Sequence, residues 1–303
     1  MAPTSRVTAP DVRARKVAAG HQPIVMVTAY DAPGALMADE AGVDVILVGD
    51  TLAMVVLGYE DTLQVTIDDM AHHTAAVARV RPSAMVLGDL PWLSYHLSVE
   101  DTVRNAARLI RAGASAVKLE GGTKRVRMVR AIVDAEIPVM GHIGLTPQSV
   151  HALGGFKVQG REASAVRGLL DDAQALVDAG VFAIVLEAVP DEVAAMITEA
   201  VPVPTIGIGA GPRCDGQVLV FHDLLGLQDR IRPKFVRTYA TLKLDGIEAI
   251  RRFASDVRDG SFPADGESYH LPDEVAATFG RDVAVDDSGA SLAFYGDDAS
   301  MSG

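Results

Sequence analysis

The chain has 303 residues, 49% of them hydrophobic, and a formal net charge of −13 at pH 7. This size allows one large buried core, and the negative charge argues against a nucleic-acid surface, which needs clustered Lys and Arg. No apolar run approaches the roughly 18 residues that cross a bilayer, and the N-terminal residues lack an apolar signal core. Cys214 is the only cysteine, so an internal disulfide and a cysteine-based zinc site are excluded. We expect a cytoplasmic protein without a membrane or nucleic-acid partner.

Eight short runs rich in apolar, β-branched residues follow one another along the chain, and helix-like segments separate most of them. Strands that alternate with amphipathic helices indicate right-handed βαβ units and a parallel sheet. The pattern predicts an α/β fold, a single-domain (β/α)8 barrel of the TIM type. The predicted strands are residues 24–30, 43–49, 84–90, 116–121, 137–143, 182–188, 204–209 and 217–223.

Two predicted helices carry recognisable start signals. Thr66 and Ser98 are each followed by an aspartate three positions later, the spacing of a capping box. Apolar positions after Ser98 share one helical face, which we expect to pack on the barrel. These positions are Val103, Ala106, Ala107 and Ile110.

Two departures from a regular eightfold alternation are visible. Only GPRCDG (211–216) separates the last two predicted strands, which is too short for a crossover helix, so the seventh β/α unit must be abbreviated. A long segment at 51–65 follows the second strand, and long loops of this kind often carry function. A further helix is expected over 234–258, and an acidic, mobile tail from about 280. We divide the chain into an N-terminal extension (1–20), the barrel (21–260) and a partly disordered C-terminal extension (261–303).

Nearly every predicted strand ends in a side chain that can bind a metal, move a proton or hold a substrate. The interior of a buried strand is apolar, so polar residues recurring at strand ends need a separate cause. The carboxyl ends of parallel barrel strands meet at one face, where active sites lie. The residues at these ends are Asp50, Asp89, Glu120, His142, Glu187 and the pair His222-Asp223.

Asp50, Asp89 and Glu120 end three consecutive predicted strands, so they should meet at the barrel mouth. Three unpaired carboxylates would repel one another, and a hard divalent cation with oxygen ligands, best Mg²⁺, would relieve that repulsion. For any one of them, helix capping or pairing with an arginine remains an equal alternative.

Three further residues are candidates for binding and proton transfer. Lys118 lies two residues before Glu120 and should point into the barrel, where it would hold a substrate carboxylate or form a structural ion pair. Glu187 has apolar neighbours and suits a general base, although a buried structural glutamate is an alternative. His142 could orient the substrate or tune the base, or it could be a satisfied structural histidine.

An ordered set of motifs between about residues 20 and 258 resembles the ketopantoate hydroxymethyltransferase family. The motifs are TAYD (28–31), VGDTLAMVVLG (48–58), GDLPW (88–92), AVKLEGG (116–122), GHIGLTPQ (141–148), VLEAVP (185–190), IGIGAG (206–211), CDGQVLVFHDLLG (214–226) and KFVRTY (234–239). Two departures are Thr51, where the family often has Ser, and Ala53, where Gly is usual. Thr51 keeps the hydroxyl donor, so its role should survive.

The resemblance implies a one-carbon transferase. It would move a hydroxymethyl group from the co-substrate 5,10-methylenetetrahydrofolate to 3-methyl-2-oxobutanoate through an enolate stabilised by Mg²⁺, giving 2-dehydropantoate for pantothenate and coenzyme A synthesis. It also implies a large homo-oligomer and a role for Glu187 as proton acceptor. The implied Mg²⁺ ligands are Asp50, Asp89 and Glu120, and the substrate contacts are Asp50, Thr51, Asp89 and Lys118.

Two other functions remain open from the residues alone. A Mg²⁺-dependent lyase or mutase of 2-oxo or phosphoenol acids could use the same barrel, but such enzymes usually need a cysteine near the mouth, and none lies at a strand end before Cys214. A barrel without catalytic activity could bind a metabolite or serve as an assembly subunit, in which case Glu187 and Gln at that position would be equivalent.

Overall fold

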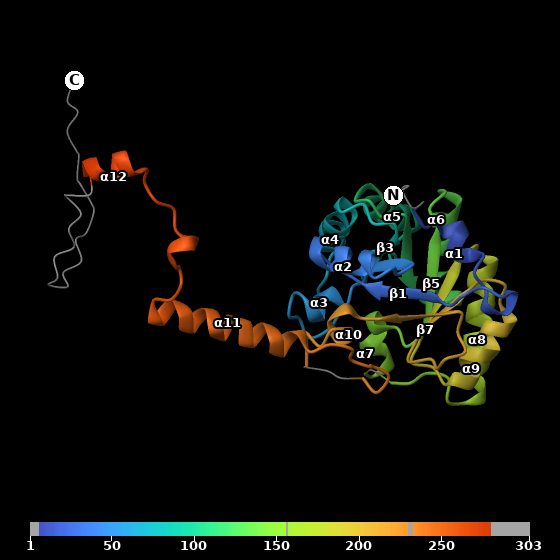
Figure 1. Cartoon of the computed structure of the whole chain (residues 1–303). Coiled ribbons are helices and arrows are strands. Elements are labelled where there is room, and N and C mark those ends of the chain that lie inside the picture. The colour runs from blue at the N-terminus through green and yellow to red at the C-terminus, as the bar shows by residue number, and fades with distance from the viewer. Residues whose placement is uncertain (1–5, 156, 230–232, 280–303) are drawn as a thin grey trace, which may run out of the picture. The chain divides into compact units, whose positions relative to one another are not determined.

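The computed structural model describes residues 6–155, 157–229 and 233–279, which contain a closed barrel of eight parallel strands (Figure 1). Consecutive strands are neighbours, and β1 closes the ring by pairing with β8. The strands are β1 (Ile24–Thr28), β2 (Val45–Val48), β3 (Met85–Asp89), β4 (Ala116–Glu120), β5 (Val139–Gly144), β6 (Ala183–Glu187), β7 (Thr205–Ile208) and β8 (Gly216–Leu219). The predicted (β/α)8 barrel is confirmed.

The strands bury two apolar layers, one inside the barrel and one beneath the helices. Alternate residues belong to different layers because the side-chain period of a strand is two. Ala116 of β4 belongs to the inner cluster, whereas Val117 belongs to the outer one. Continuing the inner series from Ala116 reaches Lys118 and then Glu120, both of which line the cavity at the barrel mouth. The predicted inward direction of these two side chains is therefore confirmed.

The barrel is surrounded by helices that connect successive strands (Figure 1). The longer ones are α2 (Ala32–Glu40), α4 (Ile67–Arg79), α5 (Val99–Arg111), α6 (Val126–Asp134), α8 (Ala163–Asp178) and α9 (Asp191–Ala200). Shorter elements at the strand ends are α3 (Leu52–Val55), the 3-10 helices η2 (Thr123–Arg125) and η3 (Pro147–Ser149), α7 (Val150–Leu153) and α10 (Phe221–Leu224). The connection between β7 and β8 contains no helix, as predicted for the abbreviated seventh unit.

An N-terminal segment closes the end of the barrel at which the strands begin, opposite their carboxyl ends. It contains α1 (Ala9–Arg13) and the 3-10 helix η1 (Val17–Ala19). Ala9 and Val12 are buried within the inner apolar cluster. Lys16, between these elements, donates to the carboxylate of Asp215 just before β8, at 2.8 Å. The described part of the extension, from residue 6, is therefore part of the packed structure.

The predicted helix starts are observed, one in full and one in part. Thr66 and Asp69 form a reciprocal capping box at α4, whereas Ser98 at α5 only accepts a hydrogen bond from the Asp101 N–H. The predicted packing face of α5 is confirmed in part, since Ala106 is buried and Ile110 packs against the outer apolar cluster, whereas Val103 and Ala107 are only half-buried. The buried residues are Thr102, Asn105, Ala106 and Leu109. Two of them are polar and are satisfied locally, because Thr102 donates to the Ser98 carbonyl and Asn105 to the Ser94 carbonyl.

Two predicted boundaries near the C-terminal end of the barrel are also wrong. The last strand stops at Leu219 because the N–H of Phe221 is held by Thr28 Oγ1 at 2.9 Å and the chain turns into α10. His222 and Asp223 consequently lie on α10 and not at a strand end. The helix expected from residue 234 begins only at α11 (Leu242–Asp259), since Tyr239 N–H donates instead to the Leu224 carbonyl of the preceding segment.

By its internal contacts the chain divides into two compact units, residues 1–244 and 245–303. The second unit contains most of α11, the 3-10 helix η4 (Asp265–Glu267) and α12 (Asp273–Phe279). Apolar side chains on α11 are exposed, with Ile250 at 69% and Phe253 at 53%. The predicted tail from 280 lies outside the described residues. No helix in the described part of the chain is long and apolar enough to span a bilayer.

Candidate active site

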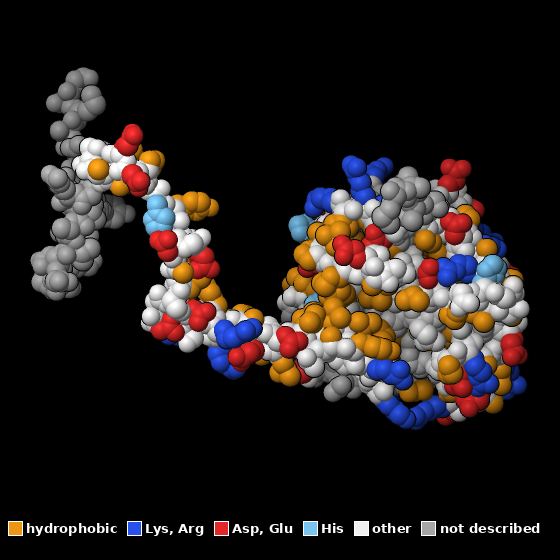
Figure 2. Space-filling model, viewed as in Figure 1, with side chains coloured by type: hydrophobic (Ala, Val, Ile, Leu, Met, Phe, Trp, Pro, Cys, Tyr) orange, Lys and Arg blue, Asp and Glu red, His pale blue; other side chains and the backbone are white. Residues whose placement is uncertain are grey.

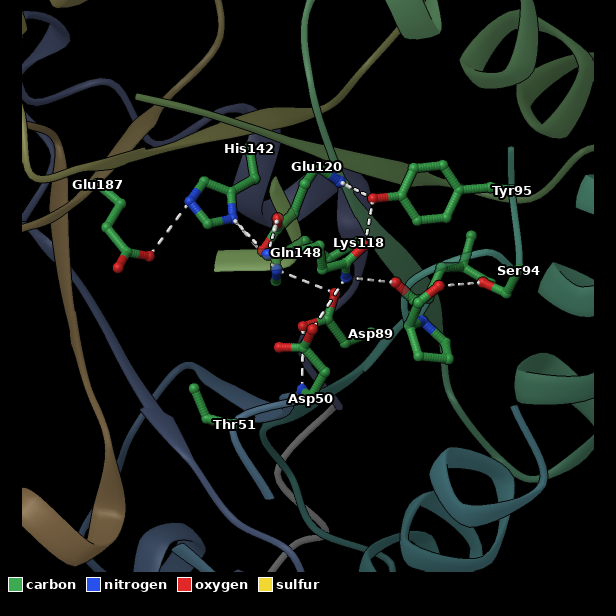
Figure 3. Close-up of polar contacts among 12 residues, drawn as sticks. Asp50, Thr51, Asp89, Ser94, Tyr95, Lys118, Glu120, His142, Gln148 and Glu187 are labelled. Atoms are coloured by element: carbon green, nitrogen blue, oxygen red, sulfur yellow. Dashed lines mark hydrogen bonds and ion pairs between the residues drawn. The ribbon is translucent and has the colours of Figure 1, made fainter. Parts of the chain in front are cut away.

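A small cavity opens where the inner residues of the strands end. Every site residue predicted for substrate, metal or proton transfer lines this cavity, whereas His222 and Asp223 do not. The predicted residues that line it are Asp50, Thr51, Asp89, Lys118, Glu120, His142 and Glu187. Figure 3 shows that their side chains converge from several strand ends on one region.

Asp89 and Lys118 form the central ion pair of this region. The two residues are register partners on β3 and β4, and Lys118 Nζ lies 2.9 Å from Asp89 Oδ1. The other oxygen of Asp89 accepts the N–H of Asp50 at 3.2 Å. Burial alone would lower the pKa of Lys118, but the neighbouring carboxylates raise it above its usual value. Lys118 is therefore a fixed positive charge at the base of the cavity.

Asp50 and Glu120 are buried carboxylates without a cation of their own. Burial, followed by the charge of Asp89, raises the pKa of Asp50 to about 7. Burial and then the charge of Asp50 raise the pKa of Glu120 well above its usual value. Glu120 Oε1 accepts no hydrogen bond from the described residues. These two groups accumulate negative charge that Lys118 does not fully neutralise.

The oxygen-rich set of donors is suited to a hard divalent cation. Among the described residues, no three His, Cys, Asp or Glu side chains already stand together as a metal-ligand set. Asp89 is held instead by Lys118 and Asp50 by Gln148. The chemistry of the donors therefore fits such a cation.

His142 lies between Lys118 and Glu187. Its Nδ1 is 3.3 Å from Lys118 Nζ and its Nε2 is 3.3 Å from Glu187 Oε2, although the second contact is not aligned as a hydrogen bond. Burial, followed by the charge of Lys118, lowers the pKa of His142. An ammonium group can only donate, so Nδ1 accepts and Nε2 carries the proton of a neutral imidazole. His142 therefore presents an N–H beside Glu187.

Glu187 ends β6 at the cavity rim, with 17% of its side chain exposed. Its backbone is fixed by β5, since the Leu145 N–H donates to the Glu187 carbonyl at 2.8 Å. Gly144 allows this approach, because a Cβ there would lie 2.3 Å from that carbonyl oxygen and its φ is +97°. Glu187 is the most accessible carboxylate of the site and can reach a ligand in the cavity.

Thr51 occupies the N-cap position of α3 and makes no capping hydrogen bond with its side chain. Its hydroxyl lies 2.8 Å from the hydroxyl of Tyr30, which follows β1. Burial raises the pKa of Tyr30, which keeps the phenol protonated. Tyr30 therefore fixes the hydroxyl of Thr51 at the cavity wall.

Two residues that the sequence analysis missed complete the polar network, Gln148 on η3 and Tyr95 in the segment between β3 and α5. Gln148 Nε2 donates to Asp50 Oδ2 at 2.9 Å, and Tyr95 OH donates to Gln148 Oε1 at 2.5 Å (Figure 3). Gln148 belongs to the GHIGLTPQ motif but stands four residues beyond β5, so no strand-end position marks it.

The fold and this mouth define a (β/α)8-barrel enzyme whose buried carboxylates, lysine and histidine share one cavity. The model of the family described as "Ketopantoate hydroxymethyltransferase" matches residues 6–265. The chain belongs to this family.

Named relatives agree with the family match. A Moorella thermoacetica protein named 3-methyl-2-oxobutanoate hydroxymethyltransferase is 59% identical over 270 residues, covering 89% of this chain and 100% of the relative. A protein of the same name from Ignicoccus hospitalis is 60% identical over 247 residues, covering 82% and 93%. The predicted family is thus confirmed.

Solved structures with a similar fold are much more distant in sequence. A phosphonopyruvate hydrolase has a TM-score of 0.56 at 15% identity, covering 92% of this chain and 96% of its own. A 2,3-dimethylmalate lyase, described as a member of the PEP mutase/isocitrate lyase superfamily, has a TM-score of 0.54 at 18% identity, covering 90% and 95%. These similarities show the barrel fold alone.

Proposed function

We propose that this protein transfers a hydroxymethyl group from 5,10-methylenetetrahydrofolate to 3-methyl-2-oxobutanoate, giving 2-dehydropantoate. Family membership supports the reaction, and the single observation that carries it is the convergence of Asp50, Asp89, Glu120 and Lys118 on one buried mouth. The lyase or mutase alternative rests only on a distant similarity of fold, so we do not retain it.

Asp50, Asp89 and Glu120 are our proposed ligands of Mg²⁺, because they offer buried carboxylate oxygens with an excess of negative charge. When bound, Mg²⁺ supplies a Lewis acid that makes the hydrogen at C3 of a 2-oxo acid more acidic. Lys118 and the Thr51 hydroxyl would hold the substrate carboxylate. Both line the cavity, the first is a cation, and the second is a hydroxyl held by Tyr30.

Glu187 is the proposed proton acceptor. It would take the C3 proton of 3-methyl-2-oxobutanoate, and the released electron pair would form a bond to the methylene carbon of the folate donor. The bonds from that carbon to N5 and to N10 of the folate both break, and water supplies the hydroxyl group. The proton taken from C3 and the remaining proton of the water end on the two nitrogens, so tetrahydrofolate leaves. The N–H of His142, 3.3 Å from Glu187 Oε2, would face the carboxylate during this transfer.

Solvent exchange tests the assignment without the folate donor. With Mg²⁺ and 3-methyl-2-oxobutanoate in D₂O, the protein should replace the C3 hydrogen by deuterium, which NMR detects. Glu187→Gln should slow this exchange by about 10²- to 10⁴-fold, the usual contribution of a general base. Glu192→Gln, on the exposed first turn of α9, is the matched control. Full exchange by Glu187→Gln would contradict the role of Glu187 as base.

The protein is also proposed to form a homo-oligomer. Exposed apolar side chains support this, since Leu244 of α11 is 65% exposed and Val25 of β1 is 50% exposed. Figure 2 shows hydrophobic side chains gathered on one face of the barrel. Light scattering of the full chain tests it, and a monomer at micromolar concentration would contradict it. The cytoplasmic location stays a prediction.

A further inference from the structure

Gln148 and Tyr95 form a neutral pair beside the carboxylates at the barrel mouth (Figure 3). Both side chains are buried, Gln148 at 5% and Tyr95 at 1% exposed. Tyr95 OH donates to Gln148 Oε1 at 2.5 Å and accepts the backbone N–H of Glu120 at 3.2 Å. The pair therefore contacts the site through both its side chains.

The hydrogen bonds of Gln148 allow only one orientation of its amide. Nε2 donates one proton to Asp50 Oδ2 at 2.9 Å and the other to the Leu90 carbonyl at 3.0 Å. Oε1 accepts from Tyr95. Rotating the amide by half a turn would place Oε1 against two acceptors, the Asp50 carboxylate and the Leu90 carbonyl, and Nε2 against the Tyr95 hydroxyl. The phenol and the Leu90 carbonyl therefore keep the NH₂ group of Gln148 directed at Asp50.

Gln148 also contacts a second carboxylate through its backbone. Its N–H donates to Glu120 Oε2 at 3.1 Å. One residue thus holds one oxygen of Asp50, after β2, and one oxygen of Glu120, at the end of β4. The other oxygen of each carboxylate is not used by Gln148, and Glu120 Oε1 has no hydrogen-bond partner among the described residues.

We propose that Gln148, oriented by Tyr95, is a positioning residue that presets Asp50 and Glu120 for a divalent cation. This inference rests on the proposed function, because it assumes that these carboxylates bind metal. A neutral donor holds the carboxylates without adding a charge that would compete with the cation, whereas Lys118 both holds and neutralises Asp89.

Binding of Mn²⁺ alone to the full chain, measured by electron paramagnetic resonance without substrate, tests the proposal. Gln148→Met keeps the length of the side chain and removes its donors, and it should weaken Mn²⁺ binding by about 10- to 100-fold. Tyr95→Phe removes only the phenol oxygen and should weaken binding by roughly fivefold. Gln174→Met, an exposed residue of α8, is the matched control and should bind as the unaltered chain does.

The outcomes separate this inference from the proposed function. Failure of the unaltered chain to bind Mn²⁺ would overturn the metal assignment and the inference together. Binding by the unaltered chain and equally tight binding by Gln148→Met would overturn the inference alone. If Gln148→Met does not fold in a thermal melt, Tyr95→Phe decides, since unchanged affinity in that variant would remove the orienting role of the phenol.

Discussion

Two pairs of lysine and aspartate lie at opposite ends of the barrel, and their surroundings differ. Near the N-terminal ends of the strands, Asp215 accepts hydrogen bonds from Lys16, the Val17 N–H and the Thr205 N–H at 2.8, 2.8 and 2.9 Å. At the mouth, Lys118 is one cation among several carboxylates. The same two residue types therefore have different roles. The pair whose aspartate is fully hydrogen-bonded stabilises the fold, whereas the excess of buried carboxylates at the mouth indicates a binding site.

The largest effect should come from breaking the pair at the mouth. Asp89→Asn should lower kcat/KM on the order of 10³-fold, because it removes a proposed cation ligand and the partner of Lys118. Its thermal stability should change little, since the loss of the ion pair is offset by weaker repulsion with Asp50. Initial rates and thermal melts measure the two quantities. Retention of most of the turnover would mean that this pair is structural, like the one at the other end.

The corresponding change at the other end should affect stability instead. Asp215→Asn should lower the free energy of unfolding by about 3 kcal/mol, because Lys16 and two backbone N–H groups lose the charge they share. Urea denaturation measures this loss, and kcat/KM of the folded protein should be unchanged. A large fall in kcat/KM without a loss of stability would contradict the distinction between the two pairs.

A third prediction uses the pH dependence of stability at the mouth. The pKa values of Asp50 and Glu120 are raised in the folded state, so the metal-free folded protein binds more protons than the unfolded chain and loses stability as the pH rises through about 7. Mg²⁺ competes with these protons, so the stabilisation it gives should grow from about pH 5 to about pH 8, reaching about 2.7 kcal/mol at a concentration of 100 Kd. Melts with and without Mg²⁺ measure it, and a gain that shrinks with rising pH would contradict the carboxylates as ligands.

The smallest effect is expected from uncharged hydroxyl groups, one at the mouth and one near the opposite end of the barrel. Thr51→Val should raise KM for the 2-oxo acid by about five- to tenfold, because one hydroxyl donor is lost, whereas Thr51→Ser should leave it nearly unchanged. Thr198→Val is a matched control, since this hydroxyl contacts Thr205 and the Ala194 carbonyl far from the mouth. Steady-state kinetics measure the effect. An equal rise of KM in Thr198→Val would show that the change is not local.

The sequence predicted the strand-end part of the site well, because the period of two that buries Ala116 also turns Lys118 and Glu120 inward. It failed at His222, since the apolar run continues past Leu219 while the strand itself ends where Thr28 holds the Phe221 N–H. This contact joins residues far apart in sequence, so local pattern could not reveal it.

Gln148 shows a different limit. Its motif was part of the family resemblance, but an amide beyond a strand end carries no pattern of its own. Its role depends on Tyr95 and Leu90, which reach it from the segment after β3. Only the folded chain brings these donors and acceptors together.

The N-terminal segment has a practical consequence for anyone who shortens the chain. Val12 is fully buried in the floor of the barrel, and Lys16 donates to the Thr198 carbonyl at 2.6 Å as well as to Asp215. A truncated protein starting at residue 21 would expose the apolar residues of that floor to water and leave the buried Asp215 without the ammonium group of Lys16. Removing this segment should therefore destabilise the barrel, although the segment lies at the end opposite the proposed active site.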